Sequence, residues 1–167
     1  MILTRSLDAE SEALSLTDVK NHLRISGTQD DDVLRFFISA IRRKTETYLQ
    51  QTLVTSTWVY KIDVFPEEIA LPMAPVQSIT SVQYVDGDGA TQTFSNIQFD
   101  TSGRLKPSYS YSWPTIRDQY NAVTVTYIAG QTHAGNVQPD IKLAMLLWIG
   151  DCDINSEDSA FGSVSEI

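Results

Sequence analysis

The chain has 167 residues and a mass of 18.6 kDa, a length typical of one domain with room for a tail or an inserted lobe. Its 12 basic and 21 acidic residues give a net charge of −9, which argues against a DNA-groove binder and against a protein that sits on anionic lipid. The single cysteine, Cys152, excludes an intramolecular disulfide and indicates a reducing compartment. No signal peptide is visible, and the apolar run 143–149 is too short to span a membrane, so we expect a soluble protein.

The first third of the chain is predicted to be helical after residues 1–14, which have no clear period. Ser15 and Asp18 have the spacing of a capping box, so a short helix should run from there to about Arg24. A longer helix should begin at the acidic residues 30–32 and end near Gln51. Its apolar stripe recurs at steps of three and four residues and comprises Leu34, Phe37, Ile38, Ile41, Thr45, Tyr48 and Leu49.

The middle of the chain shows the alternation that is typical of strands. It is clearest at 58–64, and shorter strands are predicted at 69–71, 76–85, 91–94, near Phe99, at 104–106 and at 122–128. Asp86-Gly87-Asp88-Gly89 favours a turn that joins two of these strands in a hairpin. Residues 107–118 are predicted to form a loop rich in Tyr and Ser.

The last predicted helix begins at Pro139, whose missing N–H costs nothing in a first helical turn. Residues 141–152 are apolar around almost the whole circumference, so this helix should be buried within its domain or against other subunits. Residues 151–167 hold five acids and no base. They are either a solvated tail or a segment that orders on a partner, with Phe161, Val164 and Ile167 filling pockets.

This order of elements predicts an α+β fold rather than a βαβ alternation. We expect a small helical core with an inserted antiparallel β-lobe at about 55–128. The helices occupy about 15–51 and 139–153. Residues 1–150 would form one domain, and residues 151–167 an acidic C-terminal tail.

The sequence contains no catalytic constellation, and we expect no enzyme activity, cofactor or metal. His22 and His133 lack a ligand partner at metal-binding spacing. An enzyme reading would need Cys152 to meet one of these histidines in space, whereas a small residue on a core face explains Cys152 better. The turn at 86–89 has Ala90 where a calcium loop needs Asp or Asn.

Two clusters are candidate contact sites. Arg42-Arg43-Lys44 is interpreted as a solvated helix end, with docking of an acidic partner or an adjacent subunit as the alternative. Tyr109, Tyr111 and Trp113 alternate, so they belong either to a half-buried strand or loop lid, or to an interface.

Three blocks of the sequence together resemble the head–tail connector (adaptor) proteins of tailed phages and of phage-derived gene transfer agents. The first is residues 16–25, followed by the acidic cluster and the long helix. The second is residues 71–82, running into 84–89. The third is Ser112-Trp113-Pro114 with Arg117, then 122–125 and 127–130. The closing helix with Pro139, Ile141, Lys142 and Ala144 also fits, so the resemblance covers residues 15 to about 150.

This resemblance implies a homo-oligomeric ring, expected to be a dodecamer, that lies under the portal in the virion neck after assembly in the bacterial cytoplasm. The C-terminal end would dock on the portal, for which Phe161, Val164 and Ile167 are the candidates. The far side would receive the next neck or tail protein, and DNA would pass through the ring without sequence-specific binding. Candidate intersubunit or neck contacts are Arg42, Arg43, Asp86, Gly87, Asp88, Gly89, Tyr109, Tyr111 and Trp113. The alternative is another neck protein, such as a head-completion or tail-terminator protein.

Overall fold

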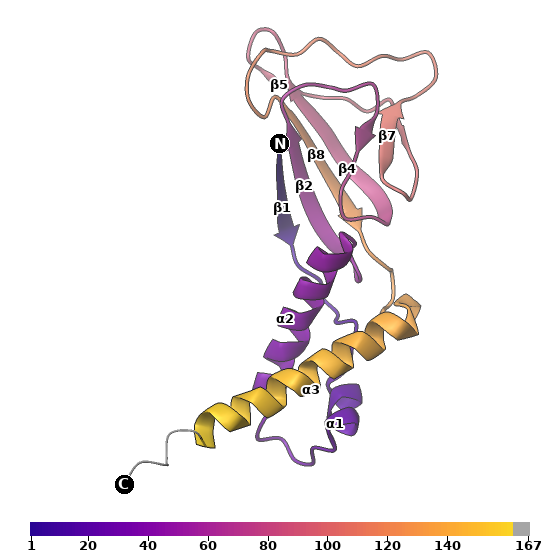
Figure 1. Cartoon of the computed structure of the whole chain (residues 1–167). Coiled ribbons are helices and arrows are strands. Elements are labelled where there is room, and N and C mark those ends of the chain that lie inside the picture. The colour runs from indigo at the N-terminus through magenta and orange to yellow at the C-terminus, as the bar shows by residue number, and fades with distance from the viewer. Residues whose placement is uncertain (162–167) are drawn as a thin grey trace. The chain divides into compact units, whose positions relative to one another are not determined.

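The computed structural model describes the backbone of residues 1–161 and the side chains of residues 1–153. The chain divides into two compact units. The β unit contains residues 1–11 and 50–133, and the helical unit contains residues 12–49 and those from 134 onward. Helices and antiparallel strands therefore occupy separate parts of the fold (Figure 1), which confirms the predicted α+β class with its inserted β-lobe.

The β unit contains two antiparallel sheets. The larger has the order β1-β2-β8-β4-β5 and is built from Ile2–Leu7, Ser56–Ile62, Val123–Ala129, Val76–Val85 and Thr91–Thr93. The smaller has the order β3-β7-β6, from Ile69–Ala70, Arg104–Pro107 and Ile97–Phe99. Every strand from β2 onward lies within one or two residues of a predicted one.

The register of the central strands explains the core. Trp58, Tyr60 and Ile62 of β2 lie opposite Tyr127, Val125 and Val123 of β8. These six side chains are buried on one face, and residues of β3, β4 and β7 join the same core. Two of the polar rings in it have hydrogen-bond partners, because Tyr127 donates to the Pro72 carbonyl at 2.7 Å and Trp58 donates to Thr52 Oγ1 at 3.0 Å.

Strand β1 was not apparent from the sequence. It pairs antiparallel with β2, from Ile2 opposite Lys61 to Leu7 opposite Thr57, with an irregularity between Arg5 and Leu7. Five of its six side chains are exposed, so no apolar alternation marks it. Its partner lies about fifty residues away in the chain, so pairing rather than local pattern determines this strand.

The helical unit consists of three α-helices in the described residues: α1 (Leu16–Leu23), α2 (Asp31–Leu49) and α3 (Pro139–Phe161). The predicted capping box is present, since the backbone N–H of Asp18 donates to the Ser15 hydroxyl and that of Ser15 to the Asp18 carboxylate. The buried faces of the helices comprise Val19 from α1, Leu34, Ile38 and Ile41 from α2, and Met145 and Ile149 from α3. None of the described helices is long and apolar enough to cross a membrane.

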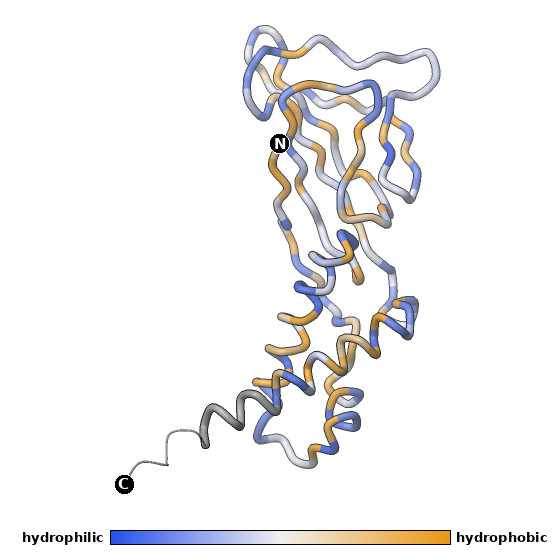
Figure 2. The backbone as a smooth tube through the Cα atoms, viewed as in Figure 1, coloured by the Kyte–Doolittle hydropathy of each residue, from blue (hydrophilic) through white to orange (hydrophobic). Residues whose placement is uncertain are grey.

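Helix α3 differs from the prediction in its burial and its length. Met145 and Ile149 are fully buried, but Leu143 and Leu147 are 54% and 59% exposed. Burial of the whole circumference within this chain is therefore wrong, and burial against other subunits stays a prediction. The helix also continues to Phe161, beyond its predicted end at about 153, so residues 154–161, assigned only to the acidic tail, are helical. The first turn after Pro139 holds the charged residues Asp140 and Lys142, and the apolar stretch follows at 143–149, where orange and pale colours lie along α3 in Figure 2. The sequence beyond residue 150 has no apolar pattern that would have indicated a helix.

Candidate interaction surfaces

The hairpin tip between β4 and β5 is held by Asp86. Its carboxylate accepts hydrogen bonds from the backbone N–H groups of Asp88 and Ala90 and from the side-chain amide of Gln92, at 2.8–3.1 Å. These bonds, led by that from Gln92, hold the pKa of Asp86 below its ordinary value. Asp86 thus shapes the turn, while Gly87 and Asp88 present exposed surface at its tip.

Gly89 has a structural reason to be glycine. Its φ is +88°, and a Cβ there would lie 2.5 Å from Nη1 of Arg117. Arg117 belongs to the loop between β7 and β8, and its backbone N–H donates to the Val85 carbonyl at 2.9 Å. The hairpin tip and this loop therefore support each other, so the candidate contacts at 86–89 and 109–113 belong to one part of the β unit.

The loop at 108–121 is anchored by Trp113. Its ring stacks on Phe65 at a centroid distance of 4.4 Å and an interplanar angle of 5°, and it lies 5.3 Å from Phe94. Its indole N–H donates to the Glu67 carbonyl at 3.3 Å. Trp113 thus packs within the β unit, and its role as an intersubunit or neck contact stays a prediction.

The tyrosines of this loop point to solvent. Tyr109 is 93% exposed and Tyr111 is 55% exposed. Tyr120, 86% exposed on the same loop, was not singled out from the sequence, because it lies outside the alternating run. The aromatic stack holds the loop in place, so its exposed tyrosines offer a large contact area and lose little conformational entropy on binding. Tyrosine is enriched in protein interfaces.

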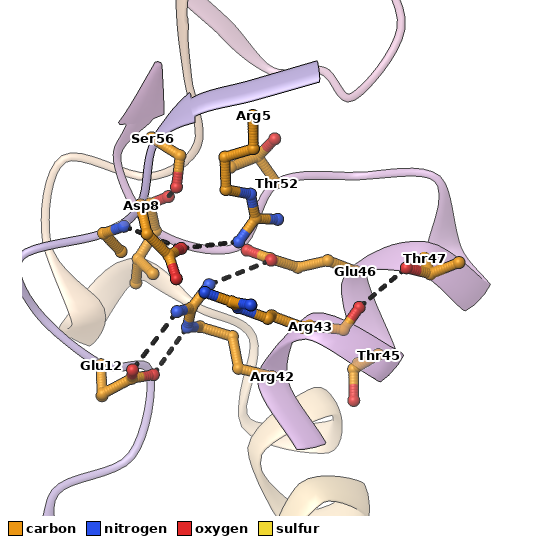
Figure 3. Close-up of polar contacts among 12 residues, drawn as sticks. Arg5, Asp8, Glu12, Arg42, Arg43, Thr45, Glu46, Thr47, Thr52 and Ser56 are labelled. Carbon is orange, nitrogen blue, oxygen red and sulfur yellow. Dashed lines mark hydrogen bonds and ion pairs between the residues drawn. The ribbon is translucent and has the colours of Figure 1, made fainter. Parts of the chain in front are cut away.

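The basic run on α2 is divided between interior and surface. Arg43 and Lys44 are exposed, but the side chain of Arg42 is only 1% exposed, so a solvated position is wrong for this residue. Arg42 Nε lies 2.6 Å from Glu12 Oε2, and Nη1 lies 3.1 Å from Glu46 Oε2 (Figure 3). Arg42 is buried because carboxylates on both sides compensate its charge.

A basic and aromatic pocket lies between α2 and α3. It has a volume of about 430 Å³ and is lined by Arg43, Lys44, Thr47, Tyr48 and Trp148. The ammonium of Lys44 lies 4.1 Å from the centroid of the Trp148 ring, which is a cation–π contact. A larger groove of about 560 Å³ lies in the same unit, with Leu14, Leu16 and Ile38 among its apolar walls and Arg35 and Lys142 among its charged ones.

The remaining candidates are the C-terminal apolar residues, the two histidines and the cysteine. Val164, Ile167 and the side chain of Phe161 lie outside the described residues. His22 and His133 are both exposed, and Cys152 is half-buried. In the described part of the chain, no group of three or more histidine, cysteine, aspartate or glutamate residues could hold a metal ion.

The α+β fold of the chain is shared with solved structures of particle necks. A chain in the neck of an empty GTA particle, computed with C6 symmetry, is 19% identical with a TM-score of 0.75, over 90% of this chain and 83% of that one. A chain in the neck of a native GTA particle, computed with C12 symmetry, is 18% identical with a TM-score of 0.72, over 90% of this chain and 82% of that one.

A third similar chain comes from the virion of a native gene transfer agent particle, with 18% identity and a TM-score of 0.70 over 90% of this chain and 83% of that one. Residues 13–86 match the family of phage gp6-like head-tail connector proteins. This match spans α1, α2 and the strands from β2 to β4, and it confirms the resemblance seen in the sequence. No curated protein sequence is significantly similar to the chain.

Proposed function

We propose that the chain is a structural head–tail connector, which joins the capsid portal to the next component of the neck or tail. The match of residues 13–86 to the connector family carries this proposal. The fold shared with neck chains of gene transfer agent particles supports it across 90% of the chain. The role is architectural, with no catalytic step.

The proposed connector acts as a ring of identical subunits at the head–tail junction. The similar necks were computed with C6 and C12 symmetry, and twelve copies satisfy both. DNA would pass through such a ring without sequence-specific binding. The net charge of −9 suits this role, because an acidic subunit offers little attraction to phosphates.

The contact surfaces of the connector follow from exposure and chemistry. Tyr109, Tyr111 and the hairpin tip at Gly87 and Asp88 form one contact region of the β unit, facing a neighbouring subunit or the next neck protein. The C-terminal segment with Phe161, Val164 and Ile167 docks on the portal.

Electron microscopy of particles that carry a labelled version of the chain tests the proposal. We expect the label in the neck, between portal and tail. When the gene is deleted, we expect heads that contain the portal but have no tail. Particles whose necks lack the chain would refute the connector function. Heads that keep a complete adaptor after the deletion, and lack only the tail, would identify another neck protein instead.

A further inference from the structure

The helical unit exposes apolar side chains on two helices. On α3, Leu143 and Leu147 are 54% and 59% exposed, and on α2, Val33 and Phe36 are 51% and 67% exposed. Leu143 and Leu147 are one helical turn apart, and Val33 and Phe36 are three residues apart, so each pair forms a continuous patch. Solvent-exposed patches of this kind mark surfaces that another protein covers.

The two patches lie on opposite sides of the helical unit. Leu147 is two residues from both buried Met145 and buried Ile149, which places it about half-way around α3 from the core. Phe36 has the same relation to buried Leu34 and Ile38 on α2. Since α2 and α3 pack on each other through their buried sides, one patch faces outward beyond α2 and the other beyond α3.

The charges around the patches are complementary. We define the α3 face by the exposed residues of its described part, which are Pro139, Asp140, Leu143, Ala144, Leu147 and Asp151. It carries two acids and no base. The α2 face is defined by the exposed residues of that helix, which are Asp32, Val33, Arg35, Phe36, Arg43, Lys44, Thr47 and Tyr48. It carries three bases and one acid, and two of the bases, Arg43 and Lys44, also line the pocket between α2 and α3. The opposite net charges of the two faces favour contact between them.

We infer that the α3 face of one copy packs on the α2 face of a second copy. This inference rests on the proposed function, because it names the surface through which the connector ring forms. Two different and complementary faces give a head-to-tail contact, which forms a ring where the rotation between copies closes, whereas a single self-complementary face stops at a dimer. In such an assembly, the leucines of α3 that are exposed in a single chain become buried, as expected for a helix that is apolar around most of its circumference.

The experiment uses Leu147→Asp on the α3 face, Phe36→Asp on the α2 face, and Val64→Asp as the matched control. Val64 is 62% exposed in the β unit and belongs to neither face. Sedimentation of the full chain over a concentration series measures self-association, and circular dichroism checks that each variant is folded. We expect each face variant to weaken association by at least about tenfold, because it brings an unpaired charge into an apolar contact. The control should associate as the wild type does.

Mixing the two face variants tests the head-to-tail geometry. Leu147→Asp keeps an intact α2 face, and Phe36→Asp keeps an intact α3 face, so the equimolar mixture should form heterodimers and stop at two copies. If instead α3 packed on α3 around a two-fold axis, Phe36→Asp would associate normally and the mixture would give no new species. That result, or unchanged association of both variants, would overturn the inference.

Neck assembly supplies a second readout. This readout applies if the wild-type chain is monomeric in solution. The inference is supported if both face variants are lost from particle necks while Val64→Asp is retained. It is overturned if both face variants are retained. Failure of the proposed function looks different. There, the wild-type chain itself is missing from necks, while the solution measurements still report on the two faces.

Discussion

Arg42 brings a full positive charge to a position without access to solvent. Its partner Glu46 is also fully buried, and Glu12 approaches from thirty residues away in the chain. A buried ion pair adds little net stability over an apolar pair, but breaking one side leaves an uncompensated charge. The arginine therefore determines how residue 12 and α2 are held together, rather than serving as a surface contact.

We predict that Arg42→Met lowers the free energy of unfolding by about 3–5 kcal/mol, because Glu46 then remains buried without its arginine. The double variant with Glu46→Leu should recover much of this loss, since both buried charges are gone. Urea denaturation of the wild type, both single variants and the double variant measures the coupling. Additive effects of the two substitutions would contradict a direct interaction between these side chains.

Asp100 sets the turn between β6 and β7 and links stability to pH. Its carboxylate accepts from the Ser102 hydroxyl at 2.6 Å and from Arg104 Nε at 2.8 Å. These hydrogen bonds, with Ser102 as the main cause, lower its pKa from 3.8 to about 2. Because the folded pKa is below the ordinary value, the ionised carboxylate stabilises the fold above pH 3.8, and this contribution is lost as the pH falls towards about 2.

We predict that Asp100→Asn lowers the Tm at neutral pH and that its difference from the wild type shrinks as the pH falls from 3.8 to about 2. Comparing the two chains at each pH removes the contributions of the other acids. The measurement is thermal unfolding followed by circular dichroism. A Tm difference that stays constant across this range would show that the carboxylate's charge has no role in the turn.

The loop at 108–121 contains a packed tryptophan and exposed tyrosines that are candidate contact residues. We predict that Trp113→Ala costs about 2–4 kcal/mol, because two aromatic pairs and part of a buried ring are lost. Tyr109→Ala should change stability by less than about 0.5 kcal/mol, because the side chain is fully solvated. The tyrosine variant should nevertheless reduce incorporation into particle necks.

Chemical denaturation and quantification of the chain in purified particles distinguish these two roles. Tyr109→Phe, which keeps the ring, is the matched control for the contact. Normal neck assembly by Tyr109→Ala would argue against an interface at this loop, and an unaltered stability of Trp113→Ala would argue against the anchor.

Local signals in the sequence predicted the elements whose causes are local. The Ser15–Asp18 capping box, the turn at 86–89 and most of the apolar stripe of α2 each depend on residues within one or two turns. Tyr48 was wrongly included in that stripe, because its side chain is 83% exposed. Strand β1 and the burial of Arg42 depend on partners about fifty and thirty residues away, which no periodicity reveals. For the same reason the sequence indicated the candidate surfaces only as clusters, whereas the difference between the packed ring of Trp113 and the exposed side chain of Tyr109 depends on the three-dimensional arrangement.

The negative charge of the whole molecule is unevenly divided between its body and its C-terminal segment. Residues 1–150 contain 12 basic and 16 acidic residues, a net charge of −4, and residues 151–167 contribute the other −5. The body is thus nearly balanced and can use opposite charges on its own faces for self-association. The C-terminal segment has no bases with which to do so, and it therefore favours a different, basic partner.

We predict that the C-terminal segment is needed for docking on the portal. A chain truncated after Asn155 should fold, because the described core residues of the helical unit all lie before residue 150. It should nevertheless fail to bind purified portal, since Phe161, Val164, Ile167 and three of the five C-terminal acids are removed. A triple variant with Phe161→Ser, Val164→Ser and Ile167→Ser, which keeps every acid, separates the apolar contribution to binding from the contribution of charge.

Co-sedimentation with portal at several salt concentrations measures both contributions, because salt weakens the charge attraction and leaves apolar docking intact. Wild-type binding by the truncated chain would move the docking site into the body of the connector, and wild-type binding by the triple variant alone would make docking electrostatic.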